Sequence, residues 1–275
     1  MTLLEKMKTA AAGRVPLWLD DAQYSSTLLA GGTVPWSDVT AYCAWRRKAQ
    51  SLLRSDVLVF PLDAALAAWV TSHPALAVAL KARRRPLYPL KTLLADVELR
   101  THLVDLIRAL RGASSDLPLA LSCRLPGALA AEVFRVATGE SCQIEDDDAD
   151  SASVYVADLL RTFGELGVDG LLLGELGDVR NVHVDAFCQP ILNLAAHYRW
   201  EIGRFQPPRH PVDGLSFIVS SAAANVSTPT GIVIETAFWQ HEHAEVPPAS
   251  AFRYAQIPTT LAPDAVLSRL DVLRQ

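Results

Sequence analysis

The chain has 275 residues, of which 50% are hydrophobic and 20% are charged, and its formal net charge is −5. The large apolar share excludes an intrinsically disordered protein, which has few apolar residues and a high net charge. The excess of acidic over basic residues argues against the broad positive surface that binds nucleic acid or an anionic membrane. The composition therefore predicts a soluble, globular protein but does not indicate its chemistry.

The cysteines and the apolar stretches point to a cytoplasmic protein. The four cysteines lie far apart and form no C-x-x-C pair, which is typical of reduced thiols. The first 14 residues lack the apolar core of a signal peptide. Residues 60–80 and 215–234 are the most apolar stretches, but neither offers about 20 predominantly apolar residues. No membrane span is expected.

Short β-rich runs alternate with longer helical patterns along the chain. Nine runs are predicted strands: 15–19, 57–62, 86–90, 117–122, 170–173, 201–205, 215–220, 231–237 and 252–257. Helical periodicity is found at 36–53, 64–82, 94–110, 156–166, 184–198 and from residue 263 onward. The last three strands follow one another without obvious helices between them.

This alternation predicts an α/β fold, a single (β/α)8 TIM-type barrel that spans residues 1–275 as one domain. Strands without a polar face, separated by helices, require a parallel sheet covered by helices. Eight units share the chain at about 34 residues each, enough for one strand and one helix. Nine candidates for eight places leave two interpretations: an irregular C-terminal third with a hairpin, or one wrong strand. An open doubly wound sheet is the alternative, but its phosphate-binding glycine fingerprint is missing.

Polar residues that follow the strands are the candidate site, because a barrel carries its active site at the C-terminal ends of its strands. The candidates are Asp20, Asp21, Asp63, Lys91, Arg124, Glu175, Arg204 and Glu235. Carboxylates that converge with cations in a pocket shift one another's pKa values and support proton transfer. Asp63 and Glu175 are the strongest catalytic candidates, since each follows a strongly apolar strand. The alternative is that such residues cap helices or lie in solvated loops.

The best apparent metal-ligand cluster is the run Gln240-His241-Glu242-His243. Neighbouring residues on a loop rarely converge on one metal, so a solvated loop is the favoured interpretation and no metal site is predicted. The chain contains no G-x-S-x-G, P-loop or H-E-x-x-H pattern.

Several segments, taken in order, resemble the uroporphyrinogen decarboxylase and cobalamin-independent methionine synthase superfamily of barrels. Residues 55–63 (SDVLVFPLD) resemble its strand ending in a functional aspartate, and residues 155–175 (YVADLLRTFGELGVDGLLLGE) its helix, turn and strand ending in an acid. Residues 117–127 (LPLALSCRLPG) and 257–274 (IPTTLAPDAVLSRLDVLR) are similar to a strand with a tight turn and to the closing loop and helix. The resemblance implies a barrel enzyme with functional acids at Asp63 and Glu175.

The chain departs from both branches of that superfamily at recognisable motifs. Residues 19–25 (LDDAQYS) stand where the decarboxylases carry an arginine-rich segment that grips substrate carboxylates, and residues 254–256 (YAQ) stand in place of their G-H-G. The zinc-dependent methyltransferase branch uses His and Cys ligands, and no H-x-C motif is present.

Three functions are compatible with these features. The first is a uroporphyrinogen-decarboxylase-like lyase that acts on a small carboxylated substrate, with Asp63 as acid/base or charge stabiliser, Glu175 as its partner, and Arg124 or Lys91 pairing with the carboxylate. In this hypothesis Asp20, Asp21 and Arg204 also bind substrate, and no cofactor is needed. The second is a zinc-dependent methyltransferase, and the third is a ligand-binding barrel that has lost catalysis. A homodimer is expected by analogy with the fold alone.

Overall fold

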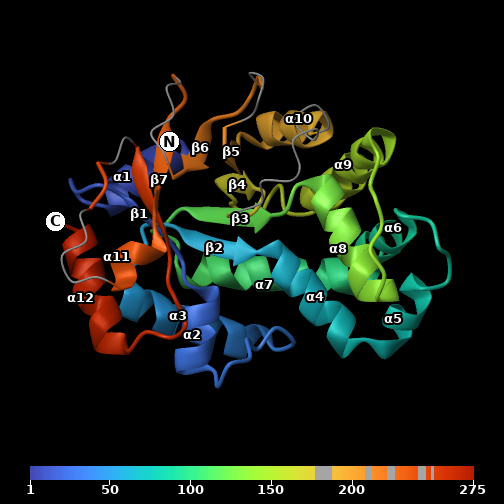
Figure 1. The fold of residues 1–275 in the computed structure, drawn as a ribbon, viewed down its shortest axis with the longest axis horizontal. Coiled ribbons are helices and arrows are strands. Elements are labelled where there is room, and N and C mark those ends of the chain that lie inside the picture. Colours follow the sequence, from blue (N-terminus) through green and yellow to red (C-terminus); the bar gives the residue numbers. More distant parts are fainter. Residues whose placement is uncertain (177–187, 208–211, 222–226, 241–245, 249–250) are drawn as a thin grey trace.

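The computed structural model describes residues 1–176, 188–207, 212–221, 227–240, 246–248 and 251–275 and contains one sheet of eight parallel strands (Figure 1). The strands are β1 (Leu17–Asp20), β2 (Leu58–Pro61), β3 (Leu119–Cys123), β4 (Gly170–Leu173), β5 (Glu201–Phe205), β6 (Phe217–Ser220), β7 (Thr230–Ile234) and β8 (Phe252–Gln256). Their order in the sheet is β1-β8-β7-β6-β5-β4-β3-β2. A parallel sheet in this order, with helices between its strands, is the predicted (β/α)8 barrel.

Twelve helices are interleaved with these strands in the described part of the chain. They are α1 (Leu3–Ala10), α2 (Ala22–Leu29), α3 (Val39–Leu53), α4 (Leu62–Ser72), α5 (Pro74–Leu80), α6 (Tyr88–Leu94), α7 (Val97–Ala113), α8 (Pro126–Thr138), α9 (Asp146–Arg161), α10 (Gln189–Tyr198), α11 (Thr236–Gln240) and α12 (Pro263–Leu273). None of these helices alone is long and apolar enough to cross a membrane; α4 and α5 reach that length only together and are bent by 105°.

The sequence explains where the helices begin. The Asp38 and Asp96 carboxylates accept hydrogen bonds from backbone N–H groups in the first turns of α3 and α7, at 2.9 and 2.7 Å. Proline occupies the first turn of α5, α6, α8, α10 and α12, where its missing N–H costs no hydrogen bond. These local signals set the helix boundaries between the strands.

The predicted strand at residues 86–90 is wrong, and it is the surplus ninth candidate. Tyr88 begins helix α6, with Pro89 in its first turn. An apolar run of five residues does not distinguish a strand from a buried helical turn, and its prolines favour the helix start. All eight strands of the described chain pair in parallel, so the hairpin considered for the C-terminal third is also wrong.

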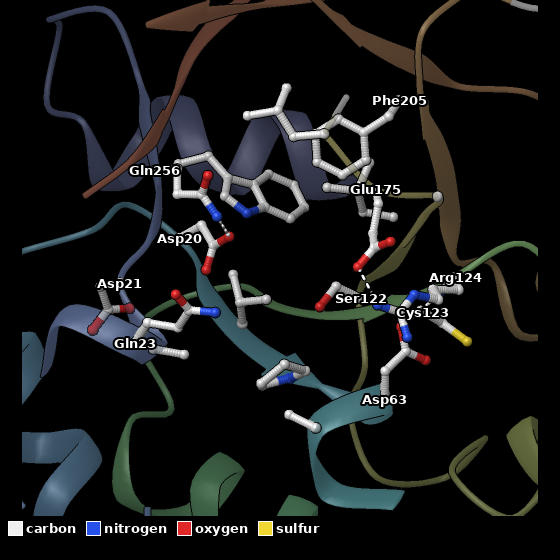
Figure 2. Close-up of a pocket in the computed structure, with 18 of the residues that line it drawn as sticks. Asp20, Asp21, Gln23, Asp63, Ser122, Cys123, Arg124, Glu175, Phe205 and Gln256 are labelled. Atoms are coloured by element: carbon white, nitrogen blue, oxygen red, sulfur yellow. Dashed lines mark hydrogen bonds and ion pairs between the residues drawn. The ribbon is translucent and has the colours of Figure 1, made fainter. Parts of the chain in front are cut away.

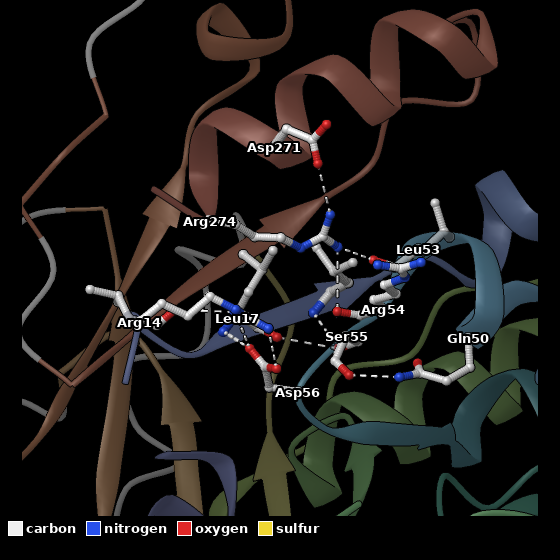
Figure 3. A network of polar contacts seen from close by, with 11 residues as sticks. Arg14, Leu17, Gln50, Leu53, Arg54, Ser55, Asp56, Asp271 and Arg274 are labelled. Atoms are coloured by element: carbon white, nitrogen blue, oxygen red, sulfur yellow. Dashed lines mark hydrogen bonds and ion pairs between the residues drawn. The ribbon is translucent and has the colours of Figure 1, made fainter. Parts of the chain in front are cut away.

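The barrel closes between β1 and the segment before β2 through one backbone hydrogen bond and several side-chain contacts instead of a strand ladder (Figure 3). The Asp56 N–H donates to the Leu17 carbonyl at 2.9 Å, and the Asp56 carboxylate accepts from the Leu17 N–H at 2.7 Å. The Ser55 hydroxyl oxygen accepts from the Leu19 N–H at 3.1 Å. Arg14 holds the Asp56 carboxylate with two hydrogen bonds of 2.7 and 2.6 Å. The segment before β2 thus satisfies the backbone N–H groups of β1.

Aromatic rings fill the interior of the barrel. Trp18 lies 5.9 Å from Phe217 and 5.8 Å from Phe252, measured between ring centroids. A Cβ atom at Gly203 would lie 1.9 Å from the Phe217 ring, and one at Gly231 would lie 2.3 Å from the Phe252 ring. The two glycines therefore make room on β5 and β7 for rings from the neighbouring strands.

Helix α1 covers the N-terminal end of the barrel. Its Leu3 and Met7 side chains are fully buried and belong to the same apolar cluster as Trp18. The Leu4 N–H donates to Glu201 at 2.8 Å, and Lys6 pairs with Asp169 at 2.5 Å. Since this end is covered, the opposite end of the barrel is where a ligand site is expected.

Candidate functional site

A cavity of about 420 Å³ lies at the C-terminal ends of the strands (Figure 2). Its walls come from the ends of β1, β2, β3, β4, β5 and β8, from the residues that directly follow them, and from helices α3, α4 and α8. Five predicted site residues line it: Asp20, Asp21, Asp63, Arg124 and Glu175. Residues from the first to the last strand of the sheet thus meet in one cavity of the size that holds a small molecule.

Asp63 lies in the first turn of α4, which begins directly after β2. Its Oδ2 accepts a hydrogen bond from the backbone N–H of Arg124 at 2.8 Å, whereas its buried Oδ1 has no hydrogen-bond partner among the described residues. Burial raises the pKa of this carboxyl to about 6, against the lowering effect of the Arg124 contacts and the Cys123 thiol. Asp63 therefore changes protonation state close to neutral pH.

Arg124 and Glu175 form an ion pair beside Asp63 (Figure 2). The Arg124 guanidinium donates to Glu175 Oε1 at 2.5 Å and lies 3.8 Å from Glu132. The Glu175 side chain is 49% exposed, so the pair faces solvent and contributes little to folding. It supplies the charge and hydrogen bonds that orient a ligand next to Asp63.

Asp20 ends β1 on another side of the cavity (Figure 2). Its Oδ2 accepts hydrogen bonds from the Tyr254 hydroxyl at 3.3 Å and the Gln256 amide at 3.2 Å. The pKa of Asp20 is raised, first by burial and then by the neighbouring Asp21 carboxylate. Burial, together with the Asp20 charge, raises the pKa of Tyr254 far above its ordinary value.

Asp21 is engaged in a buried ion pair with Arg46 of α3. One guanidinium nitrogen of Arg46 lies 3.1 and 3.0 Å from the two Asp21 oxygens, and the side chains of Arg46 and Asp21 are 4% and 6% exposed. The Arg46 Nε atom is buried without a hydrogen-bond partner in the part of the chain that the structure describes. This pair forms part of the cavity wall and holds α3 against the start of α2.

Two predicted substrate-binding residues are not brought to the cavity. Lys91 is predicted there because it follows the supposed strand at 86–90; it lies instead on α6, with its ammonium 5.5 Å from the centre of the Tyr155 ring. Arg204 is the fourth residue of β5, and Phe205 is the residue of that strand that lines the cavity. Since side chains alternate along a strand, Arg204 points to the opposite face.

Several lining residues are not predicted from the sequence: Arg46, Cys123, Glu132, Tyr254 and Gln256. Arg46 carries a usable signal, because a charged residue four positions after Tyr42 and three before Ala49 falls on the buried face of a helix. Gln256 lies one residue before the end of the predicted strand at 252–257, whereas in the structure it ends β8. The others give no distinct signal in the sequence.

Within the described residues, no three His, Cys, Asp or Glu side chains are arranged to hold a metal ion. The zinc expected for a methyltransferase therefore has no identified ligand set in that part of the chain. Gln240 ends α11, whereas residues 241–243 of the His-Glu-His run lie outside the described residues.

The chemistry available in the cavity is acid/base chemistry. It brings together two carboxyls with raised pKa values, Asp20 and Asp63, and the Arg124–Glu175 ion pair. A carboxyl whose pKa lies near the working pH both donates and accepts a proton efficiently. The fold and site together define a (β/α)8 barrel with an acidic cavity at the usual active-site end.

No protein-family model matches this chain, and no curated protein matches it either. The function is therefore inferred from the fold and the geometry of the cavity.

Proposed function

We propose that this barrel is an enzyme that transfers a proton to or from a small polar substrate, with Asp63 as the general acid/base. The observation that supports this most is the Asp63 carboxyl itself: it lines the cavity, its Oδ1 has no partner in the described chain, and its pKa is about 6. Buried carboxyls with perturbed pKa values in a cleft are concentrated at catalytic sites.

The neighbouring residues have roles that follow from their contacts. The Arg124 N–H fixes one Asp63 oxygen, and the other, the buried Oδ1, receives no hydrogen bond from the described residues. The Arg124 guanidinium is held by Glu175, which positions its positive charge to stabilise negative charge that develops on the substrate. The backbone donor and this positive charge also favour the carboxylate form of Asp63, which keeps its pKa from rising further.

Decarboxylation belongs to this reaction class, because the carbanion left after loss of carbon dioxide must be protonated. For a carboxylated substrate, Arg124 is the cation at the site, and the substrate would exchange with Glu175 for it. The half-exposed position of Glu175 permits such an exchange. Asp63 would then supply the proton to the carbon.

The four cysteines are free thiols, which supports the proposal of a reducing compartment such as the cytoplasm. Cys123 is buried beside Asp63, and its pKa lies well above the ordinary value because of burial and the Asp63 charge. The thiol is therefore neutral, and we assign no nucleophilic role to it.

Hydrogen exchange in D2O tests the proposed proton transfer across a range of substrate classes. The protein is incubated in D2O with a panel of small carboxylic acids, amines and polyols, and deuterium incorporation at carbon is followed by NMR. We expect incorporation into at least one compound class and a loss of about a hundredfold or more in the Asp63→Asn variant.

The matched control is Asp105→Asn, which removes a half-exposed carboxylate on α7 that pairs with Arg108 one turn later. This variant should exchange hydrogen at the wild-type rate. Undiminished exchange by Asp63→Asn, or no exchange with any compound class, would contradict the proposed function.

A further inference from the structure

The side of the cavity formed by β1, β5 and β8 carries an aromatic wall, which consists of Trp18, Phe205 and Tyr254. The Phe205 and Tyr254 rings meet edge to face with centroids 5.1 Å apart, and the Trp18 and Tyr254 rings lie 6.4 Å apart. The Asp20 carboxylate lies against this wall and accepts a hydrogen bond from the Tyr254 hydroxyl. A carboxylate beside aromatic rings is a combination that attracts organic cations.

The charges that line the cavity are unbalanced. Its described lining includes five acids, Asp20, Asp21, Asp63, Glu132 and Glu175, and two arginines, Arg46 and Arg124. Both arginines already contact acids: Arg46 holds Asp21, and Arg124 holds Glu175. The cavity therefore has an excess of negative charge before any ligand enters.

Glu132 is held by Arg135 at 2.8 and 2.6 Å, so the other two acids, Asp20 and Asp63, carry this excess. Asp20 accepts its hydrogen bonds from the neutral Tyr254 hydroxyl and Gln256 amide, and Asp21 occupies the nearest guanidinium. Asp63 has a buried Oδ1 atom to which no described residue donates a hydrogen bond. Asp20 is thus a partly buried carboxylate that forms no ion pair among the described residues, and a positively charged ligand would offset the cost of its burial.

We propose that the cavity binds its substrate through a protonated amine, which is received by the Asp20 carboxylate and the aromatic wall. With the amine at Asp20, the remainder of the substrate extends into the cavity towards Asp63, where the reacting carbon would lie. This inference rests on the proposed function for the role of Asp63 but makes its own claim about substrate class.

The test compares three probes of similar size and different charge: butylammonium, 1-butanol and butyrate. Their dissociation constants are measured by NMR titration or calorimetry at about pH 8, where the amine is protonated. We expect butylammonium to bind at least about tenfold more tightly than either other probe, which corresponds to ~1.4 kcal/mol. Equal or tighter binding of butanol or butyrate, or no binding of butylammonium, would overturn the proposal.

The Asp20→Asn variant locates the binding site. The asparagine oxygen can still accept from Tyr254 and Gln256, so the variant loses the charge and keeps the hydrogen bonds. We expect the tenfold preference for butylammonium to vanish in Asp20→Asn and to persist in Asp105→Asn; an unchanged preference in Asp20→Asn would overturn the assignment. The comparison of the three probes uses the wild-type protein, so it decides the substrate class even if Asp20→Asn does not fold.

Each of the two proposals can be rejected without rejecting the other. Binding of butylammonium requires no proton transfer, so its absence would leave the exchange chemistry at Asp63 standing. Conversely, specific binding of butylammonium together with undiminished hydrogen exchange by Asp63→Asn would reject the proposed function and keep the substrate class.

Discussion

At the level of single residues, Asp63 shows how position and burial together create a reactive group. It lies in the first turn of α4, where the helix dipole favours a carboxylate, and it accepts a backbone hydrogen bond from Arg124. Burial outweighs both effects and raises its pKa to about 6. Asp63 is therefore still mostly ionised at neutral pH, but ionisation is less favourable in the folded protein than in the unfolded chain.

Asp63→Asn should stabilise the protein at pH values above the pKa of Asp63. Because the folded-state pKa is about 6 against an ordinary value of 3.8, the folded protein binds the proton more tightly than the unfolded chain between these values. The wild type therefore loses stability as the pH rises through this window, by up to about 3 kcal/mol at ~1.36 kcal/mol per pKa unit, and the loss is absent at about pH 4.

Urea unfolding of the two proteins at about pH 4 and about pH 8 measures this effect. The stability advantage of Asp63→Asn should appear at the higher pH only, and Asp105→Asn should show no comparable pH dependence. An advantage of equal size at both pH values would show that the Asp63 charge is not the cause.

The buried pair of Asp21 and Arg46 makes a second prediction at this level. Asp21→Ala leaves the Arg46 charge buried without its partner and should lower the free energy of unfolding by about 3–5 kcal/mol. The double variant Asp21→Ala/Arg46→Met, which removes both charges, should be more stable than Asp21→Ala alone. Denaturant titration measures the free energy of unfolding of both variants. A double variant that is less stable than the single one would argue against an uncompensated Arg46 charge as the cause.

At the level of the helices and strands, hydrophobic periodicity predicts all eight strands but also one that does not exist. The run at 86–90 is misassigned because five apolar residues are too few to show a period, and helix α6 buries Leu90, Leu93 and Leu94 on one side. Because of this error, Lys91 is wrongly included among the predicted site residues. The predicted helix at 64–82 is divided at His73, directly before the proline that begins α5.

The seam between β1 and β2 is a feature of the strands that no periodicity reveals. Asp56 satisfies the buried N–H of Leu17 and pairs with Arg14, so Asp56→Ala removes the acceptor that both donors share. We expect a loss of about 2–4 kcal/mol in the free energy of unfolding and faster amide exchange at Leu17.

Amide hydrogen exchange by NMR locates this effect. The Leu171 N–H, on β4 in the ladder with β3, serves as the internal reference because β3 and β4 pair along their length. Faster exchange at Leu17 with an unchanged rate at Leu171 would place the weakness at the seam. Protection that is unchanged at Leu17 would mean that another group closes the barrel.

For the molecule as a whole, the barrel is predictable from the sequence and the site only in part. Alternating strands and helices indicate the barrel, and the barrel indicates which ends of the strands matter. That reasoning places Asp20, Asp63 and Glu175 correctly in the cavity. The same reasoning misses Arg46, which reaches the cavity from a helix. It also misses Tyr254, because the sequence does not show which face of β8 points into the cavity.

The balance of charge in the cavity also depends on the fold of the whole molecule. The sequence predicts Arg124 as a cation available to a substrate carboxylate, but the fold brings Glu175 and Glu132 against it. Only three-dimensional pairing shows which charges are already compensated. The acidic excess that remains shifts the expected substrate from an anion towards a cation.

The decisive measurement for the proposed acid/base is the titration of the Asp63 carboxyl carbon by NMR in protein labelled with carbon-13 at aspartate. Asp63→Asn identifies the signal by its disappearance. We expect a titration midpoint near the pKa of about 6 that the buried environment gives to Asp63. A midpoint at the ordinary aspartate value, about 4, would contradict the assignment of Asp63 as the acid/base of this barrel.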